Sequence, residues 1–195
     1  AGDIDIAGKV LAPAGNIELS AGQTVSKATK TAVTLATSAE LNVSGNWTND
    51  FADLLSGNTL GPVFPDAGTV SISSVGDVLL ETGSVIDVSG GGYVKENAIL
   101  TAGRGGNVSL EAGVFAPTVE SVLTVDGEIR GFSLDVSGTL SLTAQGFVFG
   151  EKIRPGYTTI NPALFADTGF ENFAFTANTH GILVPNGVEL DLARQ

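Results

Sequence analysis

The chain repeats one short phrase, in which a glycine and a polar residue are followed by aliphatic residues at alternate positions. Copies of the phrase occupy residues 2–6, 15–19, 68–72, 76–80, 106–110 and 138–142. Alternation places the aliphatic side chains on one face of an extended strand, and we expect the glycine to let the chain turn into that strand. Because a short strand cannot bury its apolar face alone, the repetition predicts that the copies stack as a solenoid.

The composition favours many short strands. Among the 195 residues there are 26 glycines, yet 43% of the residues are hydrophobic, which is untypical of disordered or collagen-like chains. We therefore predict an all-β fold: a right-handed parallel β-helix with a short helical or loop excursion and an aromatic-rich C-terminal part. Coils of about 20 residues would give about seven to nine coils in this length of chain.

The chain is strongly acidic, with a net charge of −12 and an isoelectric point of about 4.2. Between Lys30 and Lys95 the sequence has no basic residue, whereas it has seven acidic ones. Such a surface repels polyanions, so we expect no nucleic-acid partner and no binding to anionic lipid.

Cysteine is absent, which excludes disulfides, thiolate metal sites and cysteine catalysis. We expect neither a metal nor a cofactor. No stretch resembles a signal peptide, and no apolar run is long enough to span a membrane as a helix. The sequence has no methionine, begins at Ala1 and already carries the phrase at Gly2, so we expect a piece of a longer polypeptide.

Residues 1–150 carry the repeat and are predicted to form the coils of the β-helix. An irregular excursion interrupts them at about residues 46–67. Within it, Asn49 or Asp50 is suited to cap a short helix, and Gly57 to end it.

Residues 151–195 depart from the repeat and are predicted to form further coils or a cap. Asn161 and Pro162 predict the start of a short helix near residues 161–167, and Gly169 predicts its end. Six of the ten phenylalanines lie after residue 146. Aromatic residues gathered there would suit a lid over the open end of the strand stack.

Several stretches, taken in their order along the chain, resemble the filamentous-haemagglutinin family. They are residues 45–50, 83–91, 103–110 and 125–131, followed by 165–170 and 181–187. The order is similar to that in a conserved domain of unknown function found in large outer-membrane-associated members. The resemblance implies a parallel β-helix, two-partner secretion from Gram-negative bacteria through a dedicated outer-membrane transporter, and attachment or surface display. The domain that directs such export is not evident, so the resemblance implies a passenger segment.

The best binding candidates are Trp47, Asn49 and Asp50 in the excursion. A lone tryptophan among polar side chains can stack on a sugar ring or anchor a protein partner. The alternative, which we favour, is that Trp47 packs with Phe51 and the leucines after it, and so pins the excursion onto the flank of the solenoid.

No residue is predicted to be catalytic. His180, the one histidine, lies in no recognisable catalytic motif and is predicted to be a turn residue. Asp77, Asp87, Asp126 and Asp135 leave open a polysaccharide-active β-helical enzyme, with paired acid and base or a Ca²⁺ site. We favour the alternative, in which these carboxylates face outward and solubilise the stack.

We therefore expect a non-enzymatic structural or adhesive passenger segment of a large adhesin-like protein, secreted or displayed on the bacterial cell surface. Its expected partners are the outer-membrane secretion transporter and a glycan or protein receptor on a host or cell surface. Two alternatives stay open. One is the polysaccharide-active enzyme, and the other is a self-associating subunit of an extracellular filament.

Overall fold

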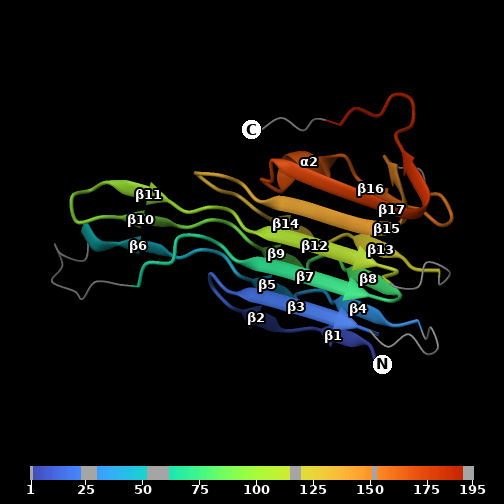
Figure 1. Ribbon diagram of the computed structural model, residues 1–195, viewed down its shortest axis with the longest axis horizontal. Coiled ribbons are helices and arrows are strands. Elements are labelled where there is room, and N and C mark those ends of the chain that lie inside the picture. The colour runs from blue at the N-terminus through green and yellow to red at the C-terminus, as the bar shows by residue number, and fades with distance from the viewer. Residues whose placement is uncertain (1, 23–29, 52–61, 115–119, 151–152, 191–195) are drawn as a thin grey trace.

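The computed structural model describes residues 2–22, 30–51, 62–114, 120–150 and 153–190 (Figure 1). The molecule is mostly β, with 48% of its residues in strands and 4% in helices. This confirms the prediction of an all-β fold.

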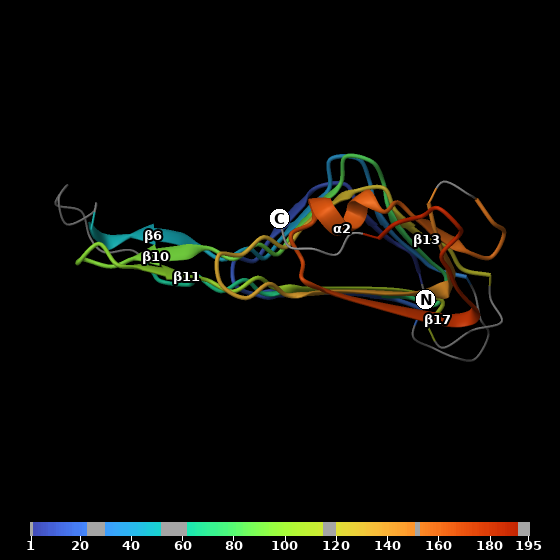
Figure 2. The ribbon, with the colours of Figure 1, turned by 90° about the horizontal axis from the view of Figure 1, so that it is seen from above.

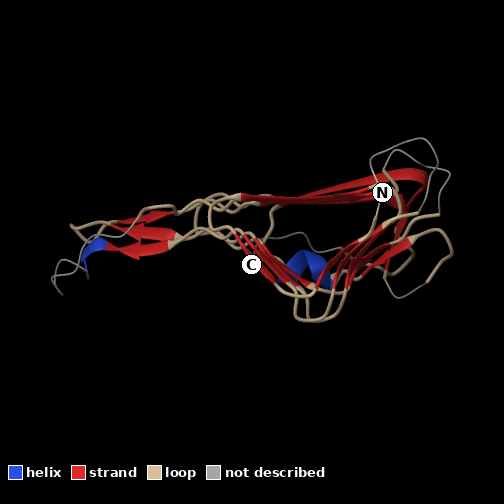
Figure 3. Ribbon diagram, turned by 90° about the horizontal axis from the view of Figure 1, so that it is seen from below, coloured by secondary structure: helices blue, strands red, loops and turns tan. Residues whose placement is uncertain are grey.

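Most of the strands belong to three parallel sheets. The first sheet contains β1 (Ile4–Ile6), β4 (Ala32–Leu35), β8 (Asp77–Leu80) and β13 (Leu123–Val125). The second contains β2 (Lys9–Leu11), β5 (Glu40–Asn42), β9 (Val85–Asp87) and β14 (Glu128–Arg130). The third contains β3 (Asn16–Ala21), β7 (Thr69–Ser74), β12 (Asn107–Ala112), β15 (Thr139–Phe149), β16 (Thr158–Ile160) and β17 (Asn172–Leu183). Figure 3 shows the third sheet facing the other two across the core.

The chain visits the first, second and third sheets in that order, and does so four times over the described residues. In the first sheet Ile4 is in register with Val33, Val33 with Val78, and Val78 with Leu123, so one pass through the three sheets takes 29 residues at first and 45 in each of the next two. The expected repeat of about 20 residues was therefore too short. The passes are longer because segments that lie outside the three sheets are inserted between their strands.

The core consists of aliphatic ladders that run from pass to pass. In the third sheet Ile17, Val70, Val108 and Leu140 are in register, and each is at most 7% exposed. Their neighbours in sequence face outward, as the alternating burial of β7 and β12 shows. Burying one such side chain stabilises the fold by about 1.5–3 kcal/mol. The prediction from alternation, that the copies of the phrase stack, is confirmed for this sheet.

The glycine of the phrase has a different role from the expected one. Gly15, Gly68, Gly106 and Gly138 form a column in which each backbone lies against the next. A Cβ added to Gly68 would lie 1.5 Å from the Gly15 carbonyl oxygen, and one added to Gly106 would lie 1.9 Å from that of Gly68. None of the four has a positive φ. Glycine is needed here because the close approach of the passes leaves no room for a side chain. It is not needed for a turn with positive φ.

The polar residue after the glycine bonds to the neighbouring pass. The Asn16 side-chain oxygen accepts a hydrogen bond from the Thr69 amide at 3.1 Å, and the Asn107 oxygen accepts one from Thr139 at 2.8 Å. Asp3 and Asp77 do the same for amides in the first sheet. The phrase therefore encodes contact between passes at its first and second positions as well as at its aliphatic ones.

A three-stranded sheet projects from one end of the molecule (Figures 1 and 2). It contains β6 (Trp47–Asn49), β10 (Gly92–Val94) and β11 (Leu100–Ala102), and the last two form an antiparallel pair. The excursion predicted at residues 46–67 thus joins a second one, formed by β10 and β11, which was not predicted from the sequence. Asp50 and Phe51 are helical, and the rest of the predicted helix lies outside the described residues.

The C-terminal elements pack along the last pass. The predicted helix is α2 (Ala163–Asp167), whose first amide donates to the Asn161 side chain at 3.0 Å. Figure 2 shows α2 and β17 on opposite sides of the molecule. Near these elements, a chain of edge contacts joins five aromatic rings: Phe147, Phe149, Phe165, Phe173 and Phe175. His180 lies within β17, so the prediction that it is a turn residue was wrong.

Candidate functional site

The excursion exposes Trp47 and Asn49 on one face of β6. Trp47 pairs with Gly92 and Asn49 with Val94 in the adjoining strand β10. The indole of Trp47 lies against Gly92, where an added Cβ would be 2.5 Å from the ring, yet the residue stays 62% exposed. The favoured expectation was that Trp47 packs with Phe51, Leu54 and Leu55. Most of the Trp47 side chain faces solvent, and the two leucines lie outside the described residues.

Asp50, the third predicted binding residue, is turned away from that face. It is 3% exposed, and its Oδ2 accepts a hydrogen bond from the Tyr93 hydroxyl at 2.7 Å. This bond raises the pKa of Tyr93 above its ordinary value of 10.0. Asp50 therefore joins β6 to β10, whereas Trp47 remains exposed.

A cavity of about 570 Å³ opens beside Trp47, between the excursion, the loop after β14 and the end of α2. Its apolar wall includes Phe132, Leu134, Phe165 and Phe170. Of these, Phe132 is 51% exposed and Leu134 64% exposed. Three segments that are far apart in sequence thus meet in one aromatic cavity.

Two glycine–phenylalanine pairs build the floor of this cavity. The Phe170 ring lies over Gly131, and the Phe132 ring lies over Gly169, where an added Cβ would in each case be 2.5 Å from the ring. The Gly131 amide also donates a hydrogen bond to the Thr168 carbonyl at 2.7 Å. Each phenylalanine ring thus packs on the glycine of the other pair. Sequence analysis missed them, although the same dipeptide at 131–132 and at 169–170 was a usable signal.

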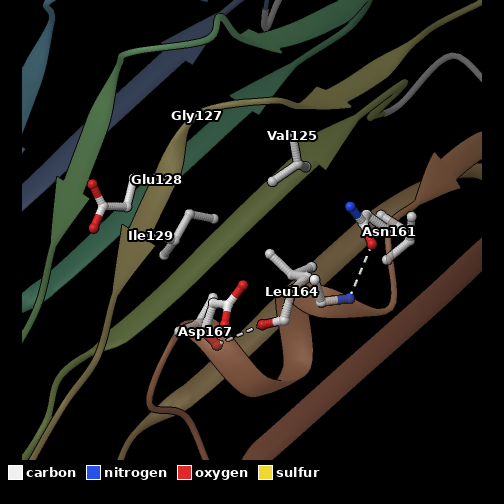
Figure 4. Close-up of a pocket in the computed structure, with 10 residues that line it drawn as sticks. Val125, Gly127, Glu128, Ile129, Asn161, Leu164 and Asp167 are labelled. Atoms are coloured by element: carbon white, nitrogen blue, oxygen red, sulfur yellow. Dashed lines mark hydrogen bonds between the residues drawn. The ribbon is translucent and has the colours of Figure 1, made fainter. Parts of the chain in front are cut away.

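A smaller cleft of about 230 Å³ lies between α2 and the strands β13 and β14 (Figure 4). Its polar groups serve the fold: Asn161 caps the helix, and the Thr168 hydroxyl donates to the Leu164 carbonyl at 2.9 Å. Glu128 points away from the helix in Figure 4 and accepts two hydrogen bonds from Arg130, which lower its pKa. The polar side chains of Asn161, Thr168 and Glu128 are thus already hydrogen-bonded within the protein.

Of the four aspartates of the enzyme alternative, Asp77 lies on β8 and Asp87 on β9, whereas Asp126 and Asp135 lie in loops. Asp77 accepts from the Val122 amide at 2.8 Å and pairs with a lysine, and Asp87 accepts from the Ser89 amide at 2.9 Å. Asp135 lies 3.7 Å from a guanidinium nitrogen of an arginine. Within the described part of the chain, no group of three or more histidine or carboxylate side chains is arranged to hold a metal ion.

Comparison with known proteins gave no match to a family model, to a curated protein or to a solved structure. Among the described residues, no helix has the length and apolar character needed to cross a membrane.

Proposed function

We propose that the chain is a segment of right-handed parallel β-helix, and that it forms the structural and adhesive passenger part of a large bacterial adhesin-like protein, secreted or displayed at the cell surface. The observation that carries the proposal is the contrast between the two parts of the molecule. Buried in-register ladders make up the sheets, whereas exposed aromatic side chains gather at the projecting excursion.

The ladders supply stiffness. Successive passes are joined by backbone hydrogen bonds along the direction of stacking, and by side-chain oxygens that accept amides of the next pass. Bending the stack would stretch many of these bonds together, so the segment holds the excursion at a fixed place. Attachment then depends on what the excursion presents.

The resemblance described above supports the proposed export by two-partner secretion, with an outer-membrane transporter as partner of the parent chain. The acidic surface agrees with a receptor that is neither nucleic acid nor anionic lipid. The proposed receptor is a glycan or a protein on a host or cell surface, and we propose no catalytic step.

A binding screen tests this function. The fragment is applied to glycan arrays and to intact cells, together with a Trp47→Ala variant and a Leu100→Ala control. Leu100 is 48% exposed on the same excursion but does not line the cavity. We expect Trp47→Ala to lose binding and Leu100→Ala to keep it. Binding by neither the parent fragment nor its variants would refute the proposal, as would release of reducing sugar from a glycan.

A second function, self-association into a filament, is favoured by one observation. Strand β17 runs for 12 residues without a charged residue or a proline, and it pairs with β15 but with no other described strand. Unprotected edges of this kind accept further strands. Light scattering that shows only monomers at high concentration would refute this candidate.

A further inference from the structure

We propose that the aromatic cavity beside Trp47 binds a neutral ligand that carries an aromatic ring. The inference names the ligand class of the proposed attachment surface and in that sense rests on the proposed function. The volume of the cavity, about 570 Å³, falls within the range of small-molecule sites in proteins.

The charge of the ligand follows from the lining. None of the described residues that line the cavity is ionisable, although the chain as a whole has a net charge of −12. An anion would lose its hydration there without gaining a partner and would be repelled by the rest of the surface. A cation would also lack a carboxylate in the lining.

The ring follows from the walls. Trp47, Phe132, Phe165 and Phe170 bring four aromatic side chains to one cavity, with Leu134 at its rim. Trp47 rests one part of its ring on Gly92 and leaves 62% of the residue exposed, so a planar apolar group can cover it. Aromatic pairs gain about 0.5–1.5 kcal/mol beyond their buried area, which favours a ring over an aliphatic chain.

Hydrogen-bonding capacity in the lining is small. The two hydroxyl side chains of the lining belong to Ser133 and Ser137. Ser133 already donates to the Gly103 carbonyl and accepts from the Asp135 amide. A sugar, whose several hydroxyls each need a partner, would find too few of them here. Of the receptors proposed above, the cavity therefore favours one that presents an aromatic ring over a glycan.

The single indole N–H signal of Trp47 allows a direct test by NMR titration of the intact fragment. The probes are 2-naphthol, which is neutral at pH 7, its anionic analogue 2-naphthoate, and the neutral sugar methyl β-glucopyranoside. We expect 2-naphthol to shift the Trp47 signal saturably and to bind at least about tenfold more tightly than either other probe. No saturable shift, equal binding of 2-naphthoate, or tighter binding of the sugar would overturn the proposal.

Variants then locate the contacts, with binding measured by equilibrium dialysis. Trp47→Ala should weaken 2-naphthol binding about tenfold or more. Trp47→Phe should retain most of the affinity, and Leu100→Ala should change nothing. An unchanged Trp47→Ala variant, or a Leu100→Ala variant as weak as Trp47→Ala, would contradict the assigned contacts. Loss of cell binding with intact 2-naphthol binding would refute the attachment function and leave the cavity proposal standing, and the reverse pattern would refute only the cavity.

Discussion

The column of glycines makes a sharp prediction for the Gly106→Ala variant. The new Cβ would lie 1.9 Å from the Gly68 carbonyl oxygen, whereas real Cβ contacts essentially never fall below 3.0 Å. The two passes must therefore separate by roughly 1 Å at this point. The Gly106 amide donates to the Val88 carbonyl at 2.8 Å, so such a shift also strains a backbone hydrogen bond.

The expected magnitude follows from three terms. Overpacking of this kind costs about 1–3 kcal/mol, and loss of one backbone hydrogen bond costs about 1 kcal/mol. Replacing glycine by alanine restricts the unfolded chain and returns about 0.4–1 kcal/mol. We expect Gly106→Ala to lower the free energy of unfolding by about 2–3 kcal/mol, and the midpoint of thermal unfolding by about 5–10 °C.

Urea unfolding followed by far-ultraviolet circular dichroism measures the effect on the strands, since fluorescence of the single tryptophan reports on the excursion. Gly8→Ala is the matched control, because no atom lies within 4 Å of the added Cβ and φ is not positive there. We expect this control to be unchanged or slightly more stable. Stability of Gly106→Ala within about 0.5 kcal/mol of the Gly8→Ala control would refute the close approach of the passes.

Three further predictions follow from the contacts. Asn107→Ala should lower the free energy of unfolding by about 1 kcal/mol, because the Thr139 amide loses its acceptor; urea unfolding measures this, and no change would contradict the role of the phrase's polar residue. Asp50→Asn should bring the raised pKa of Tyr93 back toward 10.0 in an ultraviolet titration, and an unchanged midpoint would contradict the hydrogen bond between them. The pKa of Glu128 is lowered from 4.5 in the folded state, so its contribution to stability is present above pH 4.5 and is lost as the pH falls through the folded value. Glu128→Gln should therefore flatten the acid limb of the stability profile, though only slightly, because the pair is exposed.

The strands could be predicted from the sequence because alternation is a local property. The alternate positions of Ile17 and Leu19 predict an extended strand from the local sequence alone, and β3 includes both residues. The number of residues that separates one pass from the next is not encoded in a local pattern. It is fixed by the length of the inserted segments. Gly92 lies in a strand of the second excursion, and the local sequence does not predict this because glycine is untypical of strand interiors.

The cavity could not be predicted from the sequence, because it is formed by residues that are far apart in the chain. Trp47 was recognised as a candidate, yet its exposure depends on Gly92, a residue 45 positions later that lies beneath its ring. The walls contributed by Phe132 and Phe170 come from two further passes. Each phenylalanine is typical of a buried core when it is considered alone, and only the pairing of passes leaves one of them half exposed at a rim.

The same steric constraint that builds the ladders explains why recognition is expected in the inserted segments. A residue inside a ladder has a neighbour in the pass before and in the pass after, and the carbonyl oxygen of Gly68 leaves no room even for a methyl group at Gly106. A change there must be accommodated in two directions, so the ladder positions are poorly suited to acquiring a binding group. Trp47 and Leu134 lie in segments that leave the ladders, where the side chain has space on its outer side. Binding groups can change in these segments at little cost to the stack, because the contacts between passes are made elsewhere.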